Sequence, residues 1–260
     1  MDNVMMNNGN TLPAWYNVVA PQNDIRNGVL DESIFAANIE EVATGTAPVV
    51  YQDIRYFFEC TYVTDGIKEL IRRVVQALNG KESQNRVISL QTGFGGGKTH
   101  SLISLYHVVK DSSIFRDLGV ARTILEPEDM PQFNNAKVAV FTQNTVNVVD
   151  GHQVADGIIT HTLWGELAWQ LGGREAYELV RNDDTQMIAP NAQKFKTILE
   201  KASPALILID ELADYCNKAS GKIVGSGTLF TQTNSFIQAL TEVVSSVSKT
   251  VLICTLPASA

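Results

Sequence analysis

Residues 87–100 have the sequence Val-Ile-Ser-Leu-Gln-Thr-Gly-Phe-Gly-Gly-Gly-Lys-Thr-His, an apolar run that passes into a glycine-rich turn. The apolar run is typical of a buried β-strand, and the residues after the turn have the apolar spacing of a helix. Backbone N–H groups of such a turn and the positive end of the following helix together attract phosphate oxygens. The sequence therefore predicts a site that holds the phosphates of a nucleoside triphosphate.

Two side chains of this turn have specific expected roles. Lys98 would neutralise the β- and γ-phosphates during catalysis, and the Thr99 hydroxyl would ligate Mg²⁺. Thr92 stands where the common pattern GxxxxGK(S/T) has its first glycine, and the glycines cluster further along, where positive φ still lets phosphate approach closely. The full set of predicted nucleotide-binding residues is Thr92, Gly93, Phe94, Gly95, Gly96, Gly97, Lys98, Thr99 and His100.

A second motif lies at residues 205–211, Ala-Leu-Ile-Leu-Ile-Asp-Glu, an apolar run that ends in two carboxylates. A central parallel strand delivers charge to the ligand-binding edge of a sheet in this way. Asp210 would hold Mg²⁺, directly or through water, and Glu211 would polarise an attacking water as a general base. Each motif alone has a plain structural alternative: a turn that needs glycines, and a strand that happens to end in acidic residues.

Four apolar runs predict the strands of one parallel sheet, over residues 86–91, 137–142, 205–210 and 250–255. Helical patterns separate or follow them, over residues 98–109, 154–171, 191–201 and 230–247. This alternation predicts an α/β domain of three layers. Right-handed crossovers bring the loops after the first and third strands to the same edge of the sheet, so the two motifs would meet there.

The fourth strand ends near Thr255, at the same edge. In P-loop ATPases with an extra strand between the two motif strands, a polar residue at this place senses the γ-phosphate or orients water. Thr255 is therefore predicted as a catalytic residue beside Lys98 and Glu211. The alternative is a threonine that only satisfies the backbone near Pro257.

Residues 1–82 differ in sequence pattern from residues 83–260, and they are predicted to form an arm followed by a helical extension. Prolines at positions 13 and 21 favour an extended arm between them. Apolar spacing predicts helices over 33–42 and 66–78, the second ending at Asn79-Gly80. A stretch rich in glycine, serine and threonine, residues 220–233, predicts a mobile loop near the nucleotide.

Composition limits the classes of function. The 260 residues are 45% hydrophobic and 18% charged, as in ordinary globular proteins, and the net charge of −8 argues against a broad nucleic-acid surface. Direct contact with DNA by a local basic patch stays open. The three cysteines have no metal-ligand spacing, no apolar run is long enough for a bilayer, and the first residues do not resemble a signal peptide. These features predict a cytoplasmic protein without a membrane segment.

Several short motifs together resemble a known family: Pro13-Ala-Trp-Tyr, Asp24-Ile-Arg26, Leu30-Asp-Glu-Ser-Ile-Phe35, residues 91–100, Leu105-Tyr-His107 and Leu208-Ile-Asp-Glu-Leu212. They are similar to the amino-terminal part of large prokaryotic AAA+-like P-loop ATPases that are catalogued as a domain of unknown function. Genes of this family often lie beside DNA methyltransferases and helicases in phage-defence clusters. The resemblance implies an α/β three-layer P-loop NTPase core of the AAA+/ASCE kind, ATP and Mg²⁺ as cofactors, and the motor of a defence system.

The resemblance also sets expectations beyond residue 260. An ATPase sheet of this kind needs a fifth strand and a helical lid, so we expect this chain to be the amino-terminal portion of a longer polypeptide. An arginine finger cannot be placed, since it usually comes from a neighbouring subunit or from that later part. A homo-oligomer and DNA-modifying partner proteins, reached through the full-length polypeptide, are the implied partners.

Three functions remain open at this point. The first is ATP hydrolysis coupled to a conformational cycle, with the roles given above. The second is a nucleotide-gated scaffold or binding module that holds Mg·ATP without turnover. A kinase is the third, but the sequence offers no acceptor site for it. The absence of a guanine-reading Asn-Lys-x-Asp run favours ATP only weakly.

Overall fold

The computed structural model describes residues 13–20, 26, 36–81, 85–92 and 96–257. The chain divides into two units, Met1–Ala36 and Ala37–Ala260. Residues 13–20 of the first unit contain a helical turn, α1 (Trp15–Val18), closed by a hydrogen bond from Val19 N to Trp15 O of 2.9 Å. The prediction of an extended arm is therefore wrong for these residues, because a proline restricts only its immediate neighbours and leaves the residues between two prolines free to form a turn.

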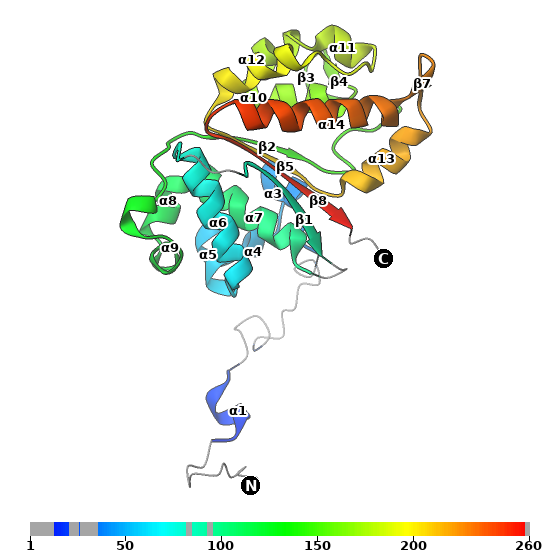
Figure 1. Cartoon of the computed structure of the whole chain (residues 1–260). Helices are drawn as coiled ribbons and strands as arrows, with labels where there is room; N and C mark the ends of the chain where they lie inside the picture. Colours follow the sequence, from blue (N-terminus) through cyan, green and yellow to red (C-terminus); the bar gives the residue numbers. More distant parts are fainter. Residues whose placement is uncertain (1–12, 21–25, 27–35, 82–84, 93–95, 258–260) are drawn as a thin grey trace. The chain divides into compact units, whose positions relative to one another are not determined.

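A parallel sheet with the strand order β1-β8-β5-β2 forms the centre of the second unit (Figure 1). Its strands are β1 (Val87–Thr92), β2 (Lys137–Phe141), β5 (Ala205–Ile209) and β8 (Thr250–Pro257). These are the four strands that the sequence predicts. The order places β8 between the two strands that carry the motifs.

Side chains alternate between the two faces of this sheet, and both faces are buried. In β5, Leu206 and Leu208 belong to one hydrophobic core, while Ala205, Ile207 and Ile209 belong to the other. Because both faces of the strand are buried, its sequence is an uninterrupted apolar run. The fold is α/β, with a layer of helices on each face of the sheet (Figure 1).

One layer contains α6 (Asp65–Leu78) and α7 (Lys98–Lys110), with shorter helices around them. Helix α6 begins where the Thr64 hydroxyl accepts a hydrogen bond from Ile67 N, and it ends before Gly80, whose φ is 86°. It confirms the helix predicted over 66–78. The shorter helices are α3 (Ile39–Thr44), α4 (Val49–Gln52), α5 (Ile54–Cys60), α8 (Ser112–Asp117) and α9 (Gly119–Ile124), followed by a 3₁₀ turn, η2 (Pro127–Asp129). Of the helix predicted over 33–42, residues 33–35 lie outside the described part of the chain, and α3 begins later than expected.

The other layer contains the longer helices of the carboxyl half: α10 (Leu163–Glu178), α11 (Arg181–Thr185), α12 (Ala192–Ala202), α13 (Leu212–Ser220) and α14 (Leu229–Ser246). Helices α12 and α14 confirm the patterns seen over 191–201 and 230–247. Helix α10 is interrupted at Gly172 and Gly173, which have non-helical backbone angles.

The helix predicted over 154–171 is wrong in its first half. Residues there form an antiparallel hairpin of β3 (His152–Ala155) and β4 (Ile158–Thr160), and α10 begins only after Thr162 caps it. Asp156-Gly157 forms the turn of this hairpin, with φ of 72° at Gly157. An Asp-Gly pair between apolar residues is a strong hairpin signal, and here it outweighs an apolar spacing that also fits a helix.

The mobile loop predicted over 220–233 is likewise a small ordered element. Strands β6 (Ile223–Val224) and β7 (Gly227–Thr228) pair in antiparallel fashion about Gly225, whose φ is 58°. Thr228 and Thr231 then form a reciprocal capping box that starts α14. The small polar residues of this segment therefore serve a turn and a helix cap. Within the described residues, no helix has both the length and the apolar character needed to cross a membrane.

Candidate functional site

The carboxyl ends of the central strands bring the predicted site residues to one edge of the sheet. The register pairs Leu90 of β1 with Thr255 of β8, and Ile209 of β5 with Cys254. Asp210 directly follows β5, so it lies level with Thr255. Helix α7 begins at Lys98, shortly after β1 ends at the same edge.

Asp210 is the centre of this arrangement. Its Oδ2 accepts a hydrogen bond of 2.8 Å from Thr99 Oγ1, and its Oδ1 accepts one of 2.5 Å from Thr255 Oγ1. The backbone N–H of Glu211 donates to Oδ1 at 3.1 Å. Although the carboxylate is only 4% exposed, three donors satisfy it. The structure thus joins Thr99, Asp210 and Thr255, which come from three different elements.

The start of α7 is open to a ligand. Its N-cap, Gly97, has a left-handed conformation with φ of 72°, and no side chain of the described residues caps the first turn. The N–H groups of an uncapped first turn attract anions. Lys98 is the neighbour of Thr99, and therefore lies at the same edge as Asp210.

Glu211 has a strained backbone and a specific partner. Its φ of 54° and ψ of 38° are left-handed, which costs a residue with a Cβ about 1 kcal/mol or more. Its N–H also donates to Thr255 Oγ1 at 3.0 Å, which helps to hold this conformation. Its Oε2 accepts a hydrogen bond of 2.7 Å from Gln143 Nε2.

Gln143 is a site residue that the sequence-based prediction missed. It lies in the turn after β2, and Lys218 supports this turn by donating to Gln143 O at 3.1 Å and to Asn144 Oδ1 at 3.1 Å. The run of polar residues at 142–145, directly after a strand of the sheet, was the available signal.

The side chain of His100 contacts residues of the segment before β1. Its Nε2 lies 3.0 Å from Thr61 Oγ1, and its ring lies 4.8 Å from the Phe57 ring, centre to centre. Burial lowers its pKa, so the ring is neutral near pH 7. Any contact of His100 with a nucleotide would therefore use its backbone N–H.

The middle of the glycine turn, Gly93, Phe94 and Gly95, lies outside the described residues. Thr92 is the last residue of β1, and Gly96 precedes the N-cap of α7. The described oxygen atoms suit Mg²⁺, which prefers hard oxygen ligands and keeps several waters. In the described part of the chain no group of three or more His, Cys, Asp or Glu side chains could hold a metal. The remaining ligands would have to be phosphate oxygens and water.

Comparison with known proteins assigns the chain to a family but not to an activity. The DUF499 N-terminal domain matches residues 16–260, a span that includes both motifs. No curated protein matches the chain. The description of the family names no reaction, so a function has to be argued from the geometry above.

Proposed function

The chain belongs to the DUF499 N-terminal domain family, and we propose that it binds Mg·ATP and hydrolyses the nucleotide. One observation carries this proposal: the hydrogen bond of 2.8 Å between Thr99 Oγ1 and Asp210 Oδ2, side chains that are 111 residues apart in sequence. Threonine after the lysine of a phosphate-binding turn and an aspartate at the end of another strand of the same sheet are the pair that holds Mg²⁺ in P-loop nucleotide hydrolases. Each residue of the pair was predicted separately.

The sheet supports a P-loop fold of the AAA+/ASCE kind. Strand β8, which carries Thr255, lies between β1 and β5 in the sheet. This is the arrangement expected of P-loop ATPases with an extra strand between the motif strands. In such a fold the phosphates rest on the turn at 92–97 and on the first N–H groups of α7.

In the proposed reaction each side chain has a separate task. Lys98 binds the β- and γ-phosphates, and Thr99 Oγ1 and Asp210 hold Mg²⁺, which offsets charge on the phosphate oxygens. Glu211 accepts a proton from the attacking water. Thr255 donates to Asp210 and accepts from Glu211 N, so it fixes the relative positions of the metal ligand and the base.

The resemblance of the short motifs supports a wider role. We place the domain as the ATPase motor of a larger DNA-related or phage-defence protein, working in the cytoplasm. DNA-modifying proteins and further copies of the polypeptide are its proposed partners. These proposals extend beyond the site itself and depend on the full-length polypeptide.

A second candidate is a nucleotide-gated scaffold that binds Mg·ATP without turnover. The observation that favours it is the 2.7 Å bond from Gln143 to Glu211, which engages the proposed base. Parallel measurements of ATP binding and phosphate release in the full-length polypeptide separate the two. Tight binding with phosphate release no faster than in buffer identifies the scaffold.

Substitution of Glu211 tests hydrolysis directly. We expect Glu211→Gln to retain ATP binding and to slow phosphate release about 100-fold or more, the range for a lost general base. Lys98→Ala should abolish ATP binding itself. Glu242→Gln, at an exposed position of α14, is the control and should change neither quantity. Turnover that is unchanged by Glu211→Gln would reject the assigned base.

A further inference from the structure

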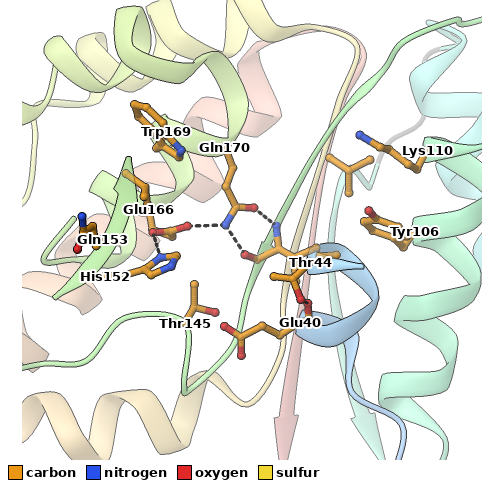
Figure 2. Close-up of a pocket in the computed structure, with 14 residues that line it drawn as sticks. Glu40, Thr44, Tyr106, Lys110, Thr145, His152, Gln153, Glu166, Trp169 and Gln170 are labelled. Carbon is orange, nitrogen blue, oxygen red and sulfur yellow. Dashed lines mark hydrogen bonds and ion pairs between the residues drawn. The ribbon is translucent and has the colours of Figure 1, made fainter. Parts of the chain in front are cut away.

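A cavity of about 430 Å³ lies beside β2, and neither Asp210 nor the residues that donate to it are among those that line it (Figure 2). Strand β2 ends the strand order, so one of its edges has no neighbouring strand. Side chains from α3, α7, β3 and α10 surround this edge, and Val138 and Val140 of β2 form its floor. Nothing in the proposed hydrolysis uses this cavity.

Within the cavity, the side chain of Gln170 already occupies part of the strand edge as another strand would. Its Oε1 accepts from Val140 N at 2.7 Å, and its Nε2 donates to Val140 O at 2.8 Å. The primary amide thus makes both hydrogen bonds that a neighbouring peptide group makes in a sheet. A peptide that adds to this edge would take the place of the Gln170 amide and make the same pair of hydrogen bonds with Val140.

The charges of the cavity favour a basic ligand at one end. Glu166, only 2% exposed, is satisfied by Gln170, by Thr160 and by His152, whose Nδ1 lies 2.9 Å from Glu166 Oε2. Glu40 accepts a hydrogen bond of 2.8 Å from Thr142 Oγ1, but none of the ion pairs among the described residues includes it. Lys110 lies on the other side of the cavity in Figure 2. The pKa of His152 is raised by its hydrogen bond to Glu166 and also by the charge of Glu40, so the two carboxylates share one histidine. This end of the cavity therefore carries more negative than positive charge and favours a further cation.

A short chain of hydrogen bonds joins this cavity to the proposed base. Glu40 holds the hydroxyl of Thr142, the first residue after β2, and Thr142 N donates to Thr145 Oγ1 at 2.8 Å. The turn closed in this way carries Gln143, which binds Glu211. A group that draws the Glu40 carboxylate away from Thr142 would therefore loosen the turn that positions Gln143.

We propose that this cavity binds an extended polypeptide segment of a partner protein, with a lysine or arginine side chain against Glu40 and main-chain amides along β2, and that binding releases Glu211 from Gln143. The regulatory half of this proposal rests on the proposed function, whereas the binding half does not. A partner protein is favoured over a second copy, because this chain has a net charge of −8 and is a poor source of basic segments. The main-chain hydrogen bonds favour a peptide over a small free cation.

Calorimetry with a defined peptide tests the binding half. The probe is the acetylated and amidated peptide Thr-Val-Arg-Val-Thr, compared with the same peptide carrying citrulline in place of arginine. We expect the arginine peptide to bind the wild-type protein and to bind Glu40→Gln about tenfold or more weakly, as for the loss of a hydrogen bond to a charged group. Glu41→Gln is the matched control, since Glu41 is adjacent in sequence and does not line the cavity. It should leave the affinity unchanged.

Three outcomes overturn the binding half: no binding of the arginine peptide, equal binding of the citrulline peptide, or no effect of Glu40→Gln. Equally tight binding of acetyl-arginine amide alone would show a small-molecule site and would also contradict it. A change in protein mass on gel filtration that needs no peptide would identify a second copy as the occupant.

Phosphate release tests the regulatory half. Saturating arginine peptide should raise turnover several-fold in the wild-type full-length polypeptide and leave Gln143→Ala unchanged, because Glu211 is already released in that variant. Peptide binding without any change in a measurable turnover rejects the regulation but leaves the binding site. Absence of any hydrolysis rejects the proposed function together with its regulation, while the calorimetry still decides the binding.

Discussion

Two buried aspartates, Asp184 and Asp210, differ in what surrounds them, although both are almost inaccessible to solvent and both accept several hydrogen bonds. Asp184 is 0% exposed and Asp210 is 4% exposed. Asp184 accepts from His161 N, from Thr162 Oγ1 at 2.5 Å and from Tyr177 Oη at 2.9 Å. Burial alone therefore does not separate a structural carboxylate from one that could serve a reaction.

The difference lies in the origin of the donors and in the space around them. The partners of Asp184 come from one local stretch, residues 161–177, and Gly165 packs directly against it: a Cβ at Gly165 would lie 2.1 Å from Asp184 Oδ1. The side-chain donors to Asp210 are hydroxyl groups 111 and 45 residues away. Both carboxylates accept from hydroxyl groups, so the space beside them makes the difference: Gly165 packs directly against Asp184, whereas Asp210 lies at the end of a strand beside the first turn of α7.

Replacement of Asp210 should give the largest effect and should appear only in activity. We expect Asp210→Ala to lower Mg²⁺-dependent phosphate release about 1000-fold, equivalent to about 4 kcal/mol, because a metal ligand is lost. The free energy of unfolding should change by no more than about 1 kcal/mol, since the freed threonine hydroxyls can rotate toward other acceptors. Turnover assays and urea unfolding measure the two quantities. A larger loss of stability than of activity would make Asp210 structural and remove the contrast with Asp184.

The same substitution at Asp184 should act in the opposite way. Asp184→Ala leaves the His161 N–H and the Thr162 hydroxyl without this acceptor inside the protein, and we expect a loss of about 3 kcal/mol in the free energy of unfolding. ATP binding by the remaining folded protein should be unchanged. Urea unfolding followed by circular dichroism gives the stability. A variant as stable as the wild type would contradict the structural role.

Gly165→Ala probes the packing against Asp184 without touching its charge. The added methyl group would overlap the carboxylate, and we expect a destabilisation of about 2 kcal/mol from the forced shift of α10. Gly119→Ala is the control, because a Cβ there meets no atom within 4 Å. The midpoint of thermal unfolding should fall for the first variant and stay constant for the second. Equal midpoints would mean that the contact is loose in solution.

The smallest expected effect concerns pH. Burial raises the pKa of Asp184 above its ordinary value of 3.8, although the hydrogen bonds from Thr162 and Tyr177 act against this. The folded state then holds more protons than the unfolded state, so this group's contribution to stability is complete below pH 3.8 and declines as pH rises through the folded pKa.

Asp184→Asn isolates this contribution to the pH dependence. Its Nδ2 can donate to Tyr177 Oη, which keeps Ile159 O as its own acceptor at 3.0 Å, so we expect a folded protein. We measure the unfolding free energy of wild type and variant across the acid range. As pH rises, the variant should become more stable relative to the wild type. A difference that is constant with pH would contradict the direction of the shift.

The central sheet was predictable because a strand that is buried on both faces is apolar at every position. The run at 205–209 is apolar at every position, and only a strand covered on both faces needs that. The proximity of Thr99, Asp210 and Thr255 was predictable for a related reason, since parallel strands bring their carboxyl ends to one edge. The family match covers the same residues but was not needed for either prediction.

The two hairpins were missed for different reasons, and in the first the apolar residues fit more than one period. Val154 and Ile158 suit a helix as well as a hairpin, and the deciding feature is the backbone of one glycine, Gly157. At 220–233 the small residues suggested mobility, whereas Thr228 and Thr231 use their hydroxyls to start a helix. Gln143 was missed for a third reason: the polar run at 142–145 marks the end of a strand, but its contact with Glu211 spans 68 residues, and the run does not say which of its side chains makes that contact.

The position of β8 in the sheet has a consequence for biosynthesis. Among the four described strands of the sheet this one is made last, yet it lies between β1 and β5, and Val87 pairs with Leu252. A growing chain that has released β1 therefore has none of the described strands beside it until β8, which begins at Thr250, has also left the ribosome. Contacts of such long sequence separation form slowly, and apolar strands that stay unpaired until then promote aggregation. Nascent chains of this protein should accordingly depend on chaperones until β8 emerges, and ribosome-bound chains stalled before it should be degraded by protease much faster than those stalled well after it.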